Sequence, residues 1–239
     1  MDAGDANTWA NGNQIKTDHS YSFFHLASRK IKYTFRIPSL INSLYSRREN
    51  AVVVHGGGWG LGNFIQKTAV LEKKEYCRKI IIKNLSDFNP AQKKSVYYLN
   101  DPDWDPLTNE NPANIFPPLG RIINNNHIEY VYFPDHHASL KLINESKAVI
   151  SKPGGMTLAD AIITETPFIY LEPMGANEEG NKILIDQYKI GTSFNEWEKN
   201  GFSDQRLQEF HINIGRLKKN LPDFVSGYIN DLKNTGIEY

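Results

Sequence analysis

The segment from Lys152 to Thr157 has the residues of a phosphate-binding turn, because it reads Lys-Pro-Gly-Gly-Met-Thr. It stands between an apolar run and a stretch with helical spacing, which predicts a loop that opens a helix. Free amides at a helix N-terminus, with the dipole behind them, suit a phosphate or diphosphate. Gly154 and Gly155 carry no side chain that would block the anion, and Thr157 can bind it or cap the helix. A tight turn without a ligand explains the segment equally well on its own.

A second glycine-rich segment begins at His55 and reads His-Gly-Gly-Gly-Trp-Gly-Leu-Gly. It is similar to the oxyanion-hole loop of lipase-type hydrolases, but no Gly-x-Ser-x-Gly motif accompanies it, which disfavours that class. It matches neither a Walker A loop nor the dinucleotide fingerprint. We interpret it as a strand–loop–helix unit in which Gly57, Gly58 and Gly60 let the backbone approach a ligand. Trp59 could stack on that ligand or serve a domain interface.

Acidic and amide residues follow the next predicted strand, between Glu172 and Asn181. Asn177, Glu178 and Asn181 can exchange hydrogen bonds with sugar hydroxyls. A helix whose acidic residues favour its first turn explains the same pattern, and on its own this is the commoner reason for it.

Two histidines are candidates for catalysis. His55 ends a predicted strand, where it could bind a phosphate or only fill the loop. His136 opens a predicted helix beside His137, and such a pair is usually a solvated turn. The sequence has no metal-binding spacing of histidines, and the single Cys77 rules out a cysteine-based zinc cluster and an intrachain disulfide. We therefore predict no bound metal.

The composition excludes several classes of protein. The 27 basic residues balance the 27 acidic ones, which disfavours a nucleic-acid or membrane surface driven by bulk charge. The apolar runs have the size of strands, so we predict no transmembrane helix, which needs about 20 residues. The acidic start lacks the apolar stretch of a secretory signal, which predicts a cytoplasmic protein.

The chain divides at about residue 50. Residues 1–50 are too short for a domain and predict an appendage, or the remnant of a preceding domain, with one or two short strands near residues 23–37. Residues 51–239 alternate between strands and helices, which predicts one Rossmann-like domain: a parallel sheet of five or six strands with helices on both faces. The proline-rich residues 100–118 predict a long irregular connection. Such sheets bind ligands beyond the carboxyl ends of their strands, where both glycine loops would lie. The predicted strands are 51–55, 79–83, 95–99, 128–133, 148–152 and 168–172, and the helices 64–75, 136–144, 156–164, 177–188, 203–220 and 222–233.

The stretch from Lys147 to Asp160 resembles the C-terminal, donor-binding domain of GT-B glycosyltransferases. Its Ser-Lys-Pro-Gly-Gly-Met-Thr-Leu-Ala-Asp is similar to the pattern in the group of the peptidoglycan N-acetylglucosaminyltransferase and the galactolipid synthases. The following strand with Pro173 at its end, then Asn177, Glu178 and Asn181, continues the likeness. The resemblance covers roughly residues 50–200 and departs from the family pattern at Asp160, where glutamate is usual.

The resemblance implies a site for a UDP-sugar. Gly154, Gly155, Met156 and Thr157 would bind the diphosphate, and Asn177, Glu178 and Asn181 the donor sugar. Asp160 would orient the loop or contact the ribose. The loop of Gly57, Gly58 and Gly60 would face the diphosphate or the acceptor, and the base would lie on the backbone near Phe133. The family needs no metal or other cofactor to hold the diphosphate, so the UDP-sugar enters only as a substrate.

The resemblance also implies a GT-B glycosyltransferase, or its donor-binding half, that transfers the sugar to an acceptor the sequence does not identify. GT-B enzymes have two Rossmann-like domains, and this sequence supplies one. We therefore expect a partner protein or a missing N-terminal domain to complete the site. Two alternatives stay open: a nucleotide-sugar hydrolase or epimerase on the same half-fold, and a non-catalytic binding subunit that needs a partner chain.

Overall fold

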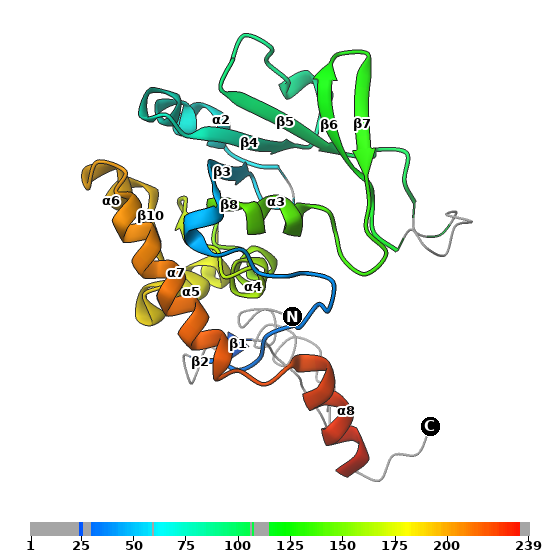
Figure 1. The fold of residues 1–239 in the computed structure, drawn as a ribbon, viewed down its shortest axis with the longest axis vertical. Helices are drawn as coiled ribbons and strands as arrows, with labels where there is room; N and C mark the ends of the chain where they lie inside the picture. The colour runs from blue at the N-terminus through cyan, green and yellow to red at the C-terminus, as the bar shows by residue number, and fades with distance from the viewer. Residues whose placement is uncertain (1–23, 26–29, 59, 106, 108–114, 235–239) are drawn as a thin grey trace.

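An eight-stranded sheet forms the body of the molecule, with the strand order β10-β9-β8-β3-β4-β5-β6-β7. The computed structural model describes residues 24–25, 30–58, 60–105, 107 and 115–234 (Figure 1). Strands β10 to β5 pair in parallel, whereas β6 and β7 continue the β5 edge as antiparallel strands. The predicted Rossmann-like α/β architecture is confirmed, but the sheet is mixed because a hairpin extends its parallel part.

The strands of this sheet are β3 (Glu49–His55), β4 (Cys77–Ile82), β5 (Ser95–Asn100), β6 (Leu119–Asn124), β7 (His127–Val131), β8 (Ser146–Ser151), β9 (Phe168–Tyr170) and β10 (Gly191–Ser193). A separate antiparallel pair, β1 (Phe24–His25) and β2 (Lys30–Ile31), agrees with the short strands predicted near residues 23–37. Strand β6 was not predicted because it follows the proline-rich connection, and β10 was not predicted because it has only three residues.

The helices are α2 (Phe64–Lys67), α3 (Ser139–Glu145), α4 (Gly155–Ile163), α5 (Ala176–Tyr188), α6 (Phe194–Lys199), α7 (Asp204–Lys219) and α8 (Phe224–Asn234), with 3-10 turns at Tyr45–Arg47, Thr68–Lys74 and Leu85–Asp87. The predicted helix over 64–75 is wrong in its second half, which is a 3-10 turn. The buried Arg78 guanidinium donates to the Ile65 carbonyl at 2.7 Å, and this bond competes with a regular helical turn. Ser203 caps the N-terminus of α7, because its hydroxyl accepts from the Arg206 amide at 3.3 Å.

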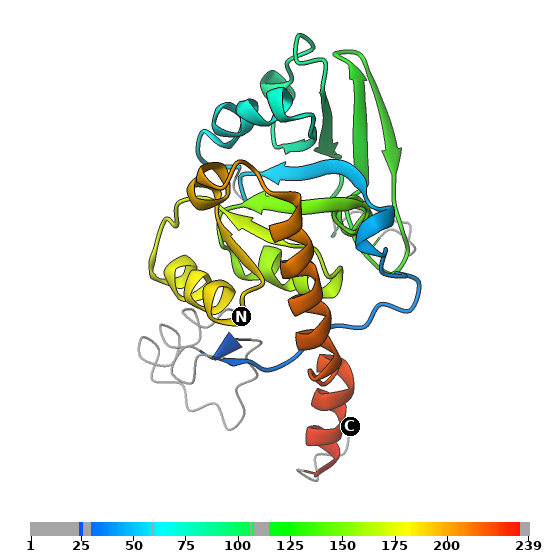
Figure 2. The same ribbon diagram turned by 60° about the vertical axis from the view of Figure 1, so that its left-hand side comes forward.

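Strand β3 lies at the centre of the parallel sheet and is apolar on both faces. Val52 and Val54 point into one core, and Val53 points into the other, because side chains alternate along a strand. Helices α2 and α6 cover the first core, whereas α3, α4 and α5 cover the second, and α7 contributes to both. Helices on both faces were predicted, and Figure 2 shows them on either side of the sheet.

The described residues before β3 pack against this domain. Buried Ile31 belongs to one of its cores, and Thr34 exchanges backbone hydrogen bonds with Pro222 and Phe224 near α8. The Arg48 guanidinium donates to the Ser146 carbonyl at 2.9 Å and to the Thr164 carbonyl at 2.7 Å, and thereby joins the start of β8 to the end of α4. The domain boundary at residue 50 stays a prediction.

Helix α8 extends away from the sheet (Figures 1 and 2). In the part of the chain that the structure describes, no helix combines the length and the apolar character that crossing a membrane requires.

Candidate functional site

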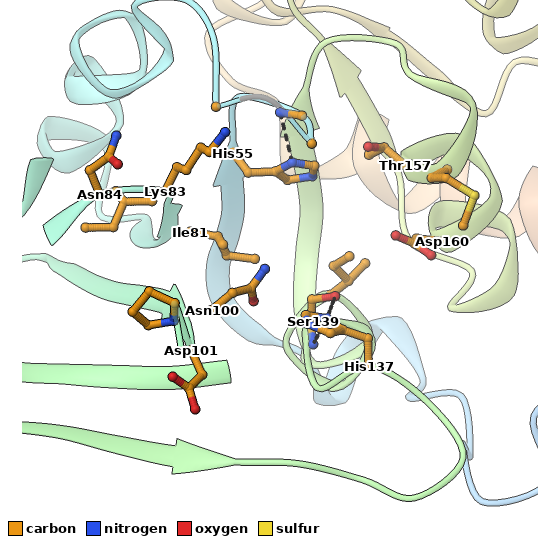
Figure 3. Close-up of a pocket in the computed structure, with 17 residues that line it drawn as sticks. His55, Ile81, Lys83, Asn84, Asn100, Asp101, His137, Ser139, Thr157 and Asp160 are labelled. Carbon is orange, nitrogen blue, oxygen red and sulfur yellow. Dashed lines mark hydrogen bonds between the residues drawn. The ribbon is translucent and has the colours of Figure 1, made fainter. Parts of the chain in front are cut away.

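The two glycine loops meet at the point where the strand order of the sheet diverges. From β3 the chain adds β4 and β5 on one side, and later adds β8, β9 and β10 on the other side. The loops that follow β3 and β8 therefore leave the same edge in different directions, which opens a crevice at the carboxyl ends of the strands. A cavity of about 610 Å³ lies there (Figure 3).

Both glycine loops contribute to the wall of this cavity. Gly57, Gly58 and Gly60 line it from the first loop, and Met156, Thr157 and Asp160 line it from the start of α4. Residues from five further places complete the wall: His55, Ile81–Asn84, Asn100–Pro102, His137 with Ser139, and Ile143. The predicted placement of both loops at one edge is therefore observed, whereas their contact with a ligand stays a prediction.

The first loop has a backbone that requires glycine. Gly57 and Gly60 have φ angles of 73° and 63°, in the left-handed region. A Cβ atom at Gly56 would lie 2.6 Å from the Phe64 ring and 2.7 Å from the Gly60 backbone. The chain therefore folds tightly over the end of β3, and this leaves the loop backbone on the cavity wall. Trp59 lies outside the described residues.

His55 is held in one tautomer at the end of β3. Its Nδ1 atom accepts from the Gly57 amide at 3.2 Å, which is drawn in Figure 3, and lies 3.4 Å from the Ser151 hydroxyl. Burial lowers the pKa of the imidazole to about 4, so the ring is neutral at pH 7. With Nδ1 acting as an acceptor, the proton of the neutral ring is on Nε2. His55 is thus equipped to donate a hydrogen bond, and it is poorly suited to take a proton from an acceptor.

The second loop places the N-terminus of α4 at the cavity. Gly154 is the N-cap residue and α4 begins at Gly155, so the amides of the first turn lie beside Thr157 on the cavity wall. A Cβ atom at Gly154 would meet no atom within 4 Å, which means that space is open above the loop. The Asn181 amide donates to the Pro153 carbonyl at 2.9 Å and holds the turn from behind.

Among the acidic residues on this cavity wall, Asp160 has the largest shift in pKa. Burial raises the pKa of its carboxyl group from 3.8 to about 7. Its carboxylate has no hydrogen-bond partner among the described residues, and Figure 3 shows its side chain beside the cavity. A ligand that donates hydrogen bonds, such as a diol, would therefore find an unused acceptor here.

The three residues predicted to bind a donor sugar all lie on α5. Asn177 and Glu178 begin α5 and do not appear among the described residues that line the cavity. The Glu178 carboxylate accepts from the Met174 amide at 2.7 Å and so closes its own loop. Asn181 is fully buried behind the second loop and supports it, because α5 turns this face inward. Its contact with a donor sugar stays a prediction.

Among the described residues, neither His136 nor Phe133 lines the first cavity, but His136, unlike Phe133, lines a second one. This cavity has a volume of about 590 Å³ and shares His137, Ser139, Met156 and Asp160 with the first one. His136 is buried, stacks on the Phe133 ring with centroids 4.7 Å apart, and has Nδ1 2.8 Å from an Asp135 carboxylate oxygen. His137 turns its Nδ1 to the Ser139 amide at 3.1 Å, and its buried Nε2 has no partner in the described chain.

The cavity residues at the ends of β4 and β5 were not predicted from the sequence motifs. Lys83, Asn84, Asn100 and Asp101 line the cavity, but none belongs to a glycine motif. The signal that could have found them is the strand prediction itself. Strands predicted to end at residues 83 and 99 end at the same edge of a parallel sheet as the glycine loops. Among the described residues, no group of three or more His, Cys, Asp and Glu side chains is arranged to hold a metal ion.

No model of a protein family and no curated protein matches the chain in sequence. Solved structures that resemble it include SnogD, a glycosyltransferase from Streptomyces nogalater, at 14% identity and a TM-score of 0.43, with 87% of this chain and 47% of that chain covered. UGT89C1 of Arabidopsis thaliana is 12% identical with a TM-score of 0.47, and the match covers 77% of this chain and 44% of that chain. MurG of Acinetobacter baumannii is 12% identical with a TM-score of 0.44, and the match covers 83% of this chain and 58% of that chain.

These structural neighbours are GT-B glycosyltransferases, and the likeness to them is one of fold. The chain spans about half the length of the structures it matches.

Proposed function

We propose that the chain binds a nucleoside-diphosphate sugar between its two glycine loops, as the donor-binding half of a glycosyltransferase. The observation that carries the proposal is the convergence of the Gly57–Gly60 loop and the N-terminus of α4 on one cavity of about 610 Å³. Amides at a helix N-terminus and a glycine loop without side chains together suit a diphosphate.

Each part of the ligand has a proposed place along this wall. The first-turn amides of α4 and the Thr157 hydroxyl would donate to the diphosphate, and the neutral His55 would add its Nε2–H. The Asp160 carboxylate would accept from the ribose hydroxyls. The second cavity, whose wall includes the His136 ring that stacks on Phe133, would take the base. We propose uracil as that base and no metal cofactor.

The proposed reaction is a direct displacement at the anomeric carbon. An acceptor hydroxyl oxygen forms the new bond to that carbon while the bond to the diphosphate oxygen breaks and leaves its electron pair on the diphosphate. Preorganised amides stabilise the charge that develops there. The hydroxyl proton must pass to a base, and His55 is poorly suited to this role because its pKa is about 4 and its free nitrogen carries a proton.

The low basicity of His55 favours one alternative, a binding subunit that becomes active only with a partner chain. The partner, or a domain missing from this sequence, would supply the base and the acceptor site. A cytoplasmic location stays part of this proposal.

Calorimetric titration of the chain with UDP, ADP and GDP tests the binding site. We expect the strongest binding for UDP, and no binding of any of the three would refute the proposal. Incubation with UDP-sugars, with and without a candidate partner, then separates the functions. Sugar transfer supports the glycosyltransferase, free sugar without an acceptor supports a hydrolase, and tight UDP binding without turnover supports the binding subunit.

A further inference from the structure

Lys152 is a buried cation that has no carboxylate partner. The side chain follows the last residue of β8, and the residue is only 8% exposed. Its Nζ atom lies 2.9 Å from the Met174 sulfur, and no ion pair of Lys152 occurs in the described part of the chain. A thioether is a weak acceptor, so it compensates poorly for removing an ammonium group from water. A buried charge of this kind is suited to receive an anion.

The Lys152 side chain lies between the first glycine loop of the candidate site and the loop that joins β9 to α5. Lys152 itself directly precedes Pro153 and the N-terminal turn of α4. A Cβ atom placed on Gly57 would lie 3.9 Å from its Cε atom, so the side chain runs beside the first glycine loop. Its contact with Met174 brings Nζ to the loop between β9 and α5.

Glu172 in the β9–α5 loop and Glu178 in the first turn of α5 have other partners. Glu172 forms an ion pair with Lys67, and the Glu178 carboxylate accepts from the Met174 amide at 2.7 Å. Neither carboxylate pairs with Lys152 in the described part of the chain. The positive charge therefore remains available on the side of α4 that faces Met174.

We infer that Lys152 binds the terminal phosphate of the nucleoside diphosphate, the one that carries the sugar; this inference rests on the proposed function. Asp160 and the second cavity lie on one side of the α4 N-terminus and would hold the nucleoside. Met174 and the start of α5 lie on the side where Lys152 points. A ligand that spans the two sides presents its terminal phosphate to Nζ, which exchanges the Met174 sulfur for a phosphate oxygen.

The attraction between the Lys152 ammonium and the phosphate oxygen becomes stronger as the reaction proceeds. When the bond between the anomeric carbon and the phosphate oxygen breaks, the electron pair stays on that oxygen, and its negative charge grows. An ammonium group in a buried setting stabilises this charge more than it stabilises the bound donor. Lys152 therefore contributes to both donor binding and release of the leaving group.

The test compares Lys152→Met, Lys152→Arg and the control Lys94→Met by calorimetric titration of the full chain with UDP, UMP and uridine. Methionine keeps the length and apolar stem of Lys152, and thermal unfolding checks that each variant folds. Lys94 is exposed at the opposite edge of the sheet, so its replacement makes the same change in net charge far from the cavity. We expect Lys152→Met to weaken UDP about 10- to 100-fold, with UMP changed less than about threefold and uridine unchanged. Lys152→Arg should retain most of the UDP affinity.

Each other outcome overturns the inference in a distinguishable way. Equal losses for UDP and UMP would place Lys152 at the inner phosphate, and unchanged UDP affinity would remove it from the phosphate site. If Lys152→Met bound UDP normally but lost UDP-glucuronate selectively, the anion would be a sugar carboxylate. A wild-type chain that binds no UDP would refute the proposed function and this inference together, whereas the first three results leave the proposed function intact.

Discussion

The replacement Asp160→Asn separates stability from ligand binding in the candidate site. The folded protein raises the pKa of this carboxyl group from 3.8 to about 7, because burial disfavours the charged form. A shift of about three pKa units corresponds to about 4 kcal/mol. Because the side chain is partly open to solvent at the cavity, we expect the buried charge to destabilise the folded state by half of this energy, ~2 kcal/mol.

The sign of the effect depends on pH. Between pH 4 and 7 the folded state holds the Asp160 proton while the unfolded state has released it, so the stability of the wild type falls as pH rises through this range. Above pH 7 both states have released the proton and the penalty is constant. Asparagine carries no charge at any of these pH values. The gain in stability from Asp160→Asn should therefore be near zero at pH 4, grow to about pH 7, and remain level above it.

The assay is thermal unfolding of wild type and variant at several pH values from 4 to 8. A gain of about 2 kcal/mol would raise the melting temperature at pH 8 by roughly 4–8 °C for a chain of this size. Asp103→Asn, at an exposed position in the loop after β5, is the control, and it should not reproduce the pH-dependent gain. The same Asp160 variant should bind UDP about tenfold more weakly, because it loses the carboxylate proposed to accept from the ribose.

Two results would contradict this reasoning. A stability gain that does not change with pH would mean that the Asp160 carboxylate is not a buried charge in solution. A pH-dependent gain with unchanged UDP affinity would refute only the ribose contact, and would leave the description of the cavity wall in place.

Three further predictions concern the glycine loops. Gly154→Asp should fold at least as well as the wild type, because the Cβ enters open space and aspartate is a good N-cap, yet it should abolish UDP binding in a titration by placing negative charge at the phosphate site. Asn181→Leu should lower the free energy of unfolding by about 1–3 kcal/mol in urea, because the Pro153 carbonyl loses its buried donor, and UDP affinity should fall with it. The His55 ring should show no titration by NMR between pH 5.5 and 8, because burial lowers its pKa to about 4; a midpoint near 6.5 would mean that the contact with Gly57 does not hold the ring neutral.

The sequence by itself determined the parallel sheet and the position of the two glycine loops on it. The apolar run Ala51–Val54 is buried on both faces, as expected of a central parallel strand, and local spacing is sufficient to show this. The glycines after β3 and β8 mark places where the backbone must turn sharply, which is a property of the residues themselves. The rule that ligands lie at the carboxyl ends of such strands then predicts the edge of the sheet, but not the shape of the site.

Only the tertiary structure decided which side chains reach that edge and in what chemical state. The pairing of β6 and β7 at the β5 edge depends on contacts between strands. The spacing of residues within each strand does not predict these contacts. Asn181 lies behind the loop and Lys152 is buried beside Met174 because α5 and the loop after β9 fold over β8. The pKa values of His55 and Asp160 likewise follow from burial by segments distant in sequence. Burial and hydrogen-bond partners are non-local quantities, so they become visible only when the strand order brings the loops together.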